Sequence, residues 1–190
     1  MPQQTQNPRP KKPNIYLLGF MGTGKTSVGK KLAQALNFKF LDSDEEIEKK
    51  YSMSIKDIFE RFGEEKFREM EREFIESGHP DEGCVISCGG GLACRQGMPE
   101  LVKSKGVSIV LFTPPEVILE RVSKNDKRPL LNMPNPLERI KTLLKERHPY
   151  YMKSGVAIAT DPEISETVKH IVRIYKNRIS EKKRRFKRRK

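Results

Sequence analysis

Short apolar runs alternate with stretches of helical periodicity along most of the chain. Five runs have the length of buried strands: 15–18, 38–41, 85–87, 107–112 and 156–159. Between them, apolar residues recur at helical spacing, as in 55–75, where Gly63 separates two predicted helices. Pro115 and Pro136 each mark a predicted helix start, and 164–175 predicts a final amphipathic helix. This alternation predicts an α/β fold, a three-layer sandwich around a five-stranded, mainly parallel sheet.

A phosphate-binding loop follows the first apolar run. Residues 19–26 read Gly-Phe-Met-Gly-Thr-Gly-Lys-Thr and fit G-x-x-x-x-G-K-[ST] at every fixed position. The glycines let backbone N–H groups face the phosphates, and the next helix adds its positive end. Lys25 would reach the β- and γ-phosphates and Thr26 would ligate Mg²⁺, whereas the alternative is a chance match in a glycine-containing loop. The fold is therefore predicted to be of the P-loop NTPase type and to bind a nucleoside triphosphate.

Two features that the sequence lacks separate small-molecule kinases from motors and switches. The run 107–112 ends in Thr-Pro-Pro, where many ATPases and GTPases carry a Walker-B aspartate. The guanine-reading order Asn-Lys-x-Asp is also missing, because residues 124–126 read Lys-Asn-Asp. Small-molecule kinases are therefore the favoured class.

Length and composition predict one domain with short extensions. The chain has 190 residues and no run of eighteen apolar residues, and its polar, Pro-rich start does not resemble a signal peptide. We therefore expect a cytoplasmic protein with no membrane partner. Cys84, Cys88 and Cys94 match no common zinc spacing and are expected to be reduced, structural thiols.

The net charge of +13 is concentrated at the chain ends. Residues 173–190 carry eleven Lys and Arg, and residues 1–13 carry three, which leaves 24 basic and 24 acidic residues in 14–172. We expect a disordered extension at 1–13, a domain at 14–179 and a solvated basic tail at 180–190. Such a tail allows weak binding to polyanions such as nucleic acid, and no other nucleic-acid partner is indicated. We expect a monomer.

Residues with chemical potential follow four of the five predicted strands. Ligands of such sheets bind where the strands end, at their carboxyl edge. The phosphate loop follows the first strand, Asp-Ser-Asp at 42–44 the second, and Cys-Gly-Gly-Gly at 88–91 the third. The fourth leads into a helix toward Arg121 and Arg128. This clustering predicts an active site at that edge.

Together, these motifs resemble the shikimate kinase family over about residues 14–172. The matching segments are 22–26, Leu-Asp-Ser-Asp at 41–44, Gly-Glu-Glu-Lys-Phe-Arg at 63–68, the glycines 89–91, and Arg-Pro-Leu-Leu at 128–131. The resemblance implies a nucleoside-monophosphate-kinase-like fold with sheet order 2-3-1-4-5 and a lid at about 123–135. It also implies transfer of the γ-phosphoryl group of MgATP to the 3-hydroxyl of shikimate. The products would be shikimate 3-phosphate and ADP, in the biosynthesis of chorismate and aromatic amino acids.

The resemblance assigns catalysis to Lys25, Asp44 and Arg128. Asp44 would orient or deprotonate the attacking hydroxyl, and Arg128 would offset charge on the transferring phosphate. The alternative for Asp44 is helix capping, since residues 43–46 read as a Ser-x-x-Glu capping box. Asp42 would support Mg²⁺ through water beside Thr26, and its alternative is a turn residue at a strand end.

Two arginines would bind the shikimate carboxylate. Arg68 has the planar guanidinium that bidentate carboxylate binding needs, but a surface salt bridge with a neighbouring acid such as Glu64 or Glu71 is the alternative. Arg147 falls on the inward, apolar stripe of its predicted helix, where an arginine needs an anion. Its alternative is a helix-end cation just before Pro149.

The remaining assignments complete the predicted site. The three glycines at 89–91 would let the backbone approach the substrate, or would form a simple turn, and Arg121 would pack on adenine, or be a surface helix residue. The full set is ATP-binding Gly22, Thr23, Gly24, Lys25, Thr26, Ser27, Arg121 and Arg128, and substrate-binding Asp44, Arg68, Gly89, Gly90, Gly91 and Arg147. Two other functions stay open: another small-molecule kinase, for gluconate or a nucleotide, and a nucleic-acid-binding module that uses the basic tail.

Overall fold

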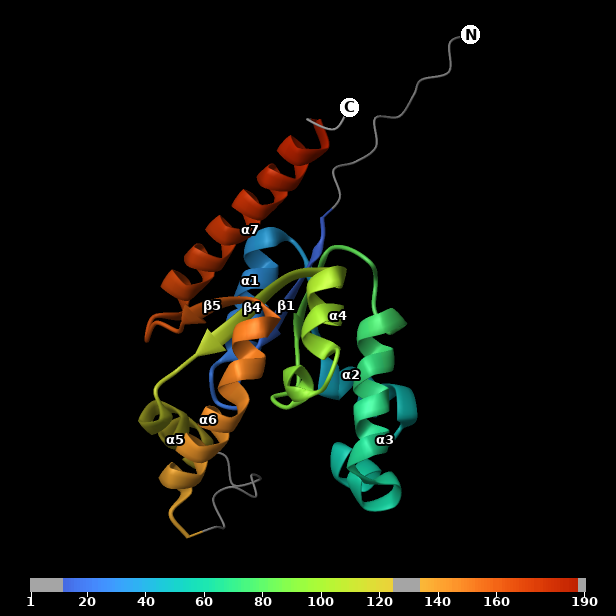
Figure 1. The fold of residues 1–190 in the computed structure, drawn as a ribbon, viewed down its shortest axis with the longest axis vertical. Helices are drawn as coiled ribbons and strands as arrows, with labels where there is room; N and C mark the ends of the chain where they lie inside the picture. Colours follow the sequence, from blue (N-terminus) through green and yellow to red (C-terminus); the bar gives the residue numbers. More distant parts are fainter. Residues whose placement is uncertain (1–11, 125–133, 188–190) are drawn as a thin grey trace.

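A five-stranded parallel sheet forms the centre of the computed structural model, which describes residues 12–124 and 134–187 (Figure 1). Its strands are β1 (Asn14–Leu18), β2 (Lys39–Asp42), β3 (Cys84–Ser87), β4 (Gly106–Phe112) and β5 (Val156–Ala159). They lie in the order β2-β3-β1-β4-β5, and every neighbouring pair is parallel. The five predicted strands and the implied sheet order are both confirmed.

Alternating side chains of the sheet build an apolar core on each face. Ile15 and Leu17 of β1 pack with α1 (Lys25–Leu36) and α7 (Ile164–Lys187), which lie side by side in Figure 1. Tyr16 and Leu18 belong to the opposite core. The helices of that side are α2 (Ser43–Tyr51), α3 (Ile55–Ser77), α4 (Met98–Lys105), α5 (Pro115–Ser123) and α6 (Pro136–Ser154), with the short 3₁₀ helix η1 (Leu92–Cys94). The three-layer α/β/α sandwich is therefore confirmed.

Local signals placed several helix ends correctly. Pro115 and Pro136 are the first residues of α5 and α6, where a missing N–H costs no hydrogen bond. Gly63 interrupts α3 with non-helical dihedrals, φ 79° and ψ 174°. This left-handed φ favours glycine, and the break separates two helical segments as predicted.

The start of α2 differs from the predicted capping box. Asp42, not Ser43, is the N-cap, and its carboxylate accepts the N–H of Asp44 at 3.2 Å. Ser43 is the first helical residue, and its hydroxyl instead accepts the N–H of Gly89 at 2.9 Å. The Ser-x-x-Glu interpretation was therefore wrong, because a tertiary contact takes the hydroxyl that the box required.

Two further boundaries differ from expectation. Pro149 lies inside α6, which continues to Ser154, so Arg147 is not the helix-end cation of the alternative interpretation. The helix α7 continues to Lys187, so the basic tail predicted from residue 180 is helical as far as the structure describes it.

The N-terminal boundary lies slightly earlier than predicted. The backbone N–H of Lys12 donates to Glu82, and the carbonyl of Pro13 accepts the hydroxyl of Tyr175 at 3.0 Å. Residues 12 and 13 therefore belong to the fold, and residues 1–11 lie outside the described part. In the described segments, no helix combines the length and apolarity that crossing a membrane requires. The three cysteines are free thiols, and burial raises the pKa of Cys88.

Candidate active site

The phosphate loop joins β1 to α1 and has the backbone of an anion cradle. Gly19, Gly22 and Gly24 have φ values of 131°, 77° and 90°, which side chains rarely adopt. The hydroxyl of Thr23 donates to the carbonyl of Phe20 at 2.8 Å and closes the turn. Gly24 is the N-cap of α1 and has no side-chain cap, so the first N–H groups of α1 are available to a phosphate.

Two predicted ATP-binding cations donate hydrogen bonds to carbonyls of this loop. The Lys25 ammonium donates to the carbonyls of Gly19 and Phe20 at 2.8 and 2.9 Å. Arg121 reaches the loop from α5 and donates to the carbonyl of Gly22 at 3.2 Å. Both positive charges thus flank the place where the phosphates would lie.

The two predicted metal-supporting residues lie side by side. The Thr26 hydroxyl donates to the Asp42 carboxylate at 3.4 Å, across the ends of α1 and β2. The described residues contain no group of three or more His, Cys, Asp or Glu that could hold a metal ion. One hydroxyl and one carboxylate suit Mg²⁺, which keeps several waters and takes phosphate oxygens as ligands. The residues present therefore fit the ion that the sequence implied.

Asp44 and a second carboxylate, that of Glu71, both approach Gly89 of the glycine loop. A Cβ placed on Gly89 would lie 2.9 Å from Asp44 Oδ1 and 2.7 Å from Glu71 Oε1, so only glycine leaves both carboxylates undisturbed. Burial raises the pKa of Asp44, the charge of Asp42 raises it further, and the hydrogen bond from Ser43 opposes both. Asp44 therefore sits in a partly desolvated, acidic environment suited to interaction with hydroxyl groups.

Arg68 and Glu71 form a largely buried ion pair on α3. Arg68 Nη1 lies 2.7 Å from Glu71 Oε2, and Arg68 Nη2 lies 2.9 Å from Glu64 Oε1. The side chain of Glu71 is only 2% exposed, and its Oε1 has no hydrogen-bond partner. Burial raises the pKa of Glu71 to about 7 against the opposing charge of Arg68. The predicted alternative of an ion pair is thus present, but Glu71 places it in the interior rather than at the surface.

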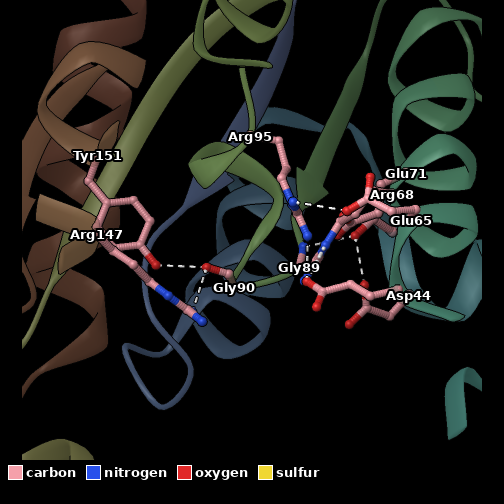
Figure 2. A network of polar contacts seen from close by, with 11 residues as sticks. Asp44, Glu65, Arg68, Glu71, Gly89, Gly90, Arg95, Arg147 and Tyr151 are labelled. Carbon is pink, nitrogen blue, oxygen red and sulfur yellow. Dashed lines mark hydrogen bonds and ion pairs between the residues drawn. The ribbon is translucent and has the colours of Figure 1, made fainter. Parts of the chain in front are cut away.

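The second predicted arginine lies on the other side of the glycine loop. Figure 2 shows Arg147 and Tyr151 on one side of Gly90, and Asp44 and Arg68 on the other. Arg147 Nη1 donates to the carbonyl of Gly90 at 3.3 Å, and the Tyr151 hydroxyl donates to the same carbonyl at 2.7 Å. The glycine loop is therefore fixed by α6 as well as by α2.

A single cavity of about 1110 Å³ collects these parts. It is lined by every predicted site residue that the structure describes: Gly22, Thr23, Gly24, Lys25, Thr26, Ser27, Asp42, Asp44, Arg68, Gly89, Gly90, Gly91, Arg121 and Arg147. Arg128, and with it the segment 125–133 of the predicted lid, lies outside the described residues, so its role stays a prediction.

Sequence reasoning missed several residues of this site. Glu71 lies three residues after Arg68, and an acid between the apolar positions Met70 and Phe74 was the available signal. Tyr151 lies one helical turn after Arg147 on the same side of α6. Residues 160–162, which follow β5, also line the cavity, so all five strands lead into the site.

The sheet order, the phosphate loop after β1 and the lysine and arginine that donate to carbonyls of that loop define an ATP-dependent P-loop kinase. A family model described as shikimate kinase matches residues 21–176. The chain belongs to the shikimate kinase family.

Individual relatives agree with this family assignment. The shikimate kinase of Thermodesulfovibrio yellowstonii is 46% identical over 155 residues, which cover 82% of this chain and 90% of that protein. A solved structure of shikimate kinase from Acinetobacter baumannii in complex with shikimate has a TM-score of 0.81 and 36% identity, and the match covers 89% and 96% of the two chains. A gluconokinase from Sinorhizobium meliloti has a TM-score of 0.57 at 20% identity over 89% and 97%, so its likeness is one of fold alone.

Proposed function

We propose that this kinase transfers the γ-phosphoryl group of MgATP to the 3-hydroxyl of shikimate and releases shikimate 3-phosphate and ADP. The reaction would serve the synthesis of chorismate and aromatic amino acids. The observation that carries the proposal is the single cavity in which the phosphate loop, the carboxylate of Asp44 and two arginines meet. A small acceptor that carries hydroxyl groups as well as a carboxylate matches these side chains, because Asp44 can bind a hydroxyl and the arginines can bind the carboxylate.

The acceptor would lie between the two arginines and the glycine loop. Arg68 and Arg147 would bind its carboxylate, and the backbone of the glycines at 89–91 would lie against its ring. The carboxylate of Asp44 would accept a hydrogen bond from the attacking hydroxyl and take its proton. The raised pKa of Asp44 makes its carboxylate a stronger base than an ordinary aspartate.

The donor side would use the phosphate loop at 22–27. Lys25 would turn from the loop carbonyls toward the β- and γ-phosphates and offset charge on the transferring group. Thr26, with Asp42 acting through water, would hold Mg²⁺, which when bound neutralises phosphate charge. Arg121 would contact the adenine ring. The catalytic role of Arg128 rests on the sequence resemblance.

The remaining parts of the proposal concern the whole chain. The kinase domain would span residues 12–179, two residues more at its start than the predicted 14–179, with a lid at about 123–135, and would work as a cytoplasmic monomer. The basic C-terminal residues from 180 onward contribute at most weak binding to polyanions, because residues 14–172 carry equal numbers of basic and acidic residues.

A kinase for gluconate or a nucleotide is the nearest competing function. The paired arginines on opposite sides of the glycine loop favour a small carboxylate over a nucleobase. Gluconate also carries a carboxylate and hydroxyls, so a direct comparison of acceptors is needed to separate it from shikimate.

The roles of Arg68 and Asp44 can be tested by two substitutions that should fail in different ways. Arg68→Lys keeps the charge but loses the fork, so the shikimate KM should rise about 10- to 100-fold and the ATP KM should change little. Asp44→Asn keeps the shape but removes the proton acceptor, so kcat should fall roughly 10²- to 10⁴-fold. If the wild-type protein phosphorylates shikimate but neither parameter changes, the acceptor site is misplaced.

A further inference from the structure

One buried residue of the phosphate loop contacts residues from both sides of the site. Phe20 occupies the first variable position of the loop, and its side chain is 1% exposed. Its carbonyl accepts the Lys25 ammonium at 2.9 Å and the Thr23 hydroxyl at 2.8 Å. The backbone of Phe20 therefore belongs to the donor side of the site.

The ring of Phe20 contacts an arginine of the proposed acceptor side. The guanidinium carbon of Arg147 lies 5.3 Å from the centroid of this ring, within the range of a cation–π contact. An edge of the same guanidinium donates to the carbonyl of Gly90 at 3.3 Å. Arg147 is thus held by an aromatic face and by a carbonyl, and neither partner is an acidic side chain.

The loop backbone also packs against the glycine loop. A Cβ placed on Gly90 would lie 3.3 Å from the backbone nitrogen of Met21 and 3.7 Å from the carbonyl oxygen of Gly19. The residue whose carbonyl anchors Arg147 therefore packs closely against the phosphate loop. The Tyr151 hydroxyl fixes that carbonyl from α6 at 2.7 Å.

We propose that Phe20 is a positioning residue for the acceptor: its ring holds Arg147 in the orientation that binds the acceptor carboxylate. This inference rests on the proposed function of Arg147. The phosphate-loop pattern leaves the position of Phe20 unrestricted, so a requirement for an aromatic residue there comes from the acceptor and not from ATP. Aliphatic side chains fill the same space but present no negative π-face to the guanidinium.

Phe20→Leu and Phe20→Met test this role, because both keep an apolar side chain and remove the ring. We expect the shikimate KM to rise about 3- to 10-fold, with the ATP KM and kcat within about twofold of wild type. Phe74→Leu is the matched control, since Phe74 is a buried phenylalanine of the same core whose ring packs against His79, whereas that of Phe20 packs against Arg147. The control should leave both KM values unchanged, and the thermal midpoint of each variant shows that it is folded.

A double-mutant cycle separates positioning from general damage to the loop. In an Arg147→Ala background, Phe20→Leu should change the shikimate KM by less than about twofold, because the guanidinium that the ring holds is gone. Unchanged shikimate KM in both Phe20 variants, an equal rise of both KM values, or an undiminished effect without Arg147 would overturn the inference alone. A wild-type protein that does not phosphorylate shikimate would overturn the proposed function first, and this inference with it.

Discussion

The hydroxyl of Ser43 accepts the backbone N–H of Gly89 at 2.9 Å, and this bond ties the start of α2 to the loop after β3. The neighbouring Asp42 caps α2 in place of Ser43. Two contacts therefore fix the start of α2: the cap by Asp42 and the hydrogen bond of Ser43 with Gly89. Asp44, the next residue of the first turn, points at the glycine loop as a result. The position of the proposed proton acceptor therefore depends on a contact between residues 46 positions apart.

Gly89→Ala should impair catalysis far more than folding. The added methyl group would lie 2.7 Å from Glu71 Oε1 and 2.9 Å from Asp44 Oδ1, so both carboxylates must move. These atoms end flexible side chains, and we expect the free energy of unfolding to change by about 1 kcal/mol or less. We expect kcat/KM for shikimate to fall about tenfold or more, because an orientation error at the reacting group is costly. Steady-state kinetics and urea unfolding of the same preparation measure both; a loss of stability with intact kinetics would contradict this prediction.

Lys25→Ala and Thr26→Ala should fail for separate reasons. In the proposed reaction, Lys25 would supply charge to the transferring phosphate, and Thr26, which lies next to Asp42, would supply a metal ligand. We expect each substitution to lower kcat by roughly 10²-fold or more. Raising the Mg²⁺ concentration should partly rescue only the threonine variant. Equal rescue of both variants in a Mg²⁺ titration would remove the distinction between the two roles.

The buried carboxyl of Glu71 predicts a specific pH dependence of stability. Its pKa in the folded protein is about 7, compared with an ordinary value of 4.5. Between these values the folded state binds more protons than the unfolded state, so the free energy of unfolding falls as the pH rises. Glu71→Gln removes this fall in the free energy of unfolding, because glutamine does not titrate. Relative to wild type, we expect the variant to gain up to about 3 kcal/mol between pH 4.5 and pH 8.

Glu73→Gln is the matched control for that measurement. Glu73 lies on the same helix but is exposed, and the hydrogen bond from Lys50 lowers its pKa. Its contribution to stability is therefore present above the ordinary carboxyl pKa and lost as the pH falls, opposite in sign to that of Glu71. Urea unfolding at pH 5 and pH 8 compares the variants, and identical pH dependence in both would show that Glu71 is not protonated in the folded protein near neutral pH.

Removal of residues 180–190 should leave the kinase reaction within about twofold of the full chain. Ile179 still packs against the core that α1 and α7 share, and within the described residues none beyond Ile164 lines the cavity. Truncation after Lys176 is the comparison, because it also removes Ile179 and should lower the thermal midpoint. Affinity for nucleic acid at low salt should fall in both truncations. A large loss of activity in a folded chain that ends at Ile179 would show that the basic end takes part in the reaction.

Much of the fold was predictable because its signals are local. The apolar runs, the prolines at helix starts and the break at Gly63 depend on a few neighbouring residues, and the strand ends that carry the site follow from parallel topology. The predicted site residues in the described part share one cavity for that reason.

What could not be predicted depends on contacts between distant segments. Ser43 matched the first position of a capping box, but its hydroxyl accepts the backbone N–H of Gly89 instead. Glu71 was considered as a surface partner of Arg68, and its burial follows only from the packing of α3 against α2 and α4 and from the approach of Glu71 to Gly89. The contact between Phe20 and Arg147 joins residues that are far apart in the sequence, and the sequence around neither residue indicates it.

The most direct test of the account is the identity of the product. Purified protein should be incubated with MgATP and equal concentrations of shikimate, gluconate or a nucleoside monophosphate, with ADP release followed and each product characterised by phosphorus and proton NMR. The account predicts rapid ADP release with shikimate alone and a product that carries the new phosphate on its 3-hydroxyl. No shikimate-dependent ADP release, faster turnover of another acceptor, or phosphate on a different hydroxyl would contradict it.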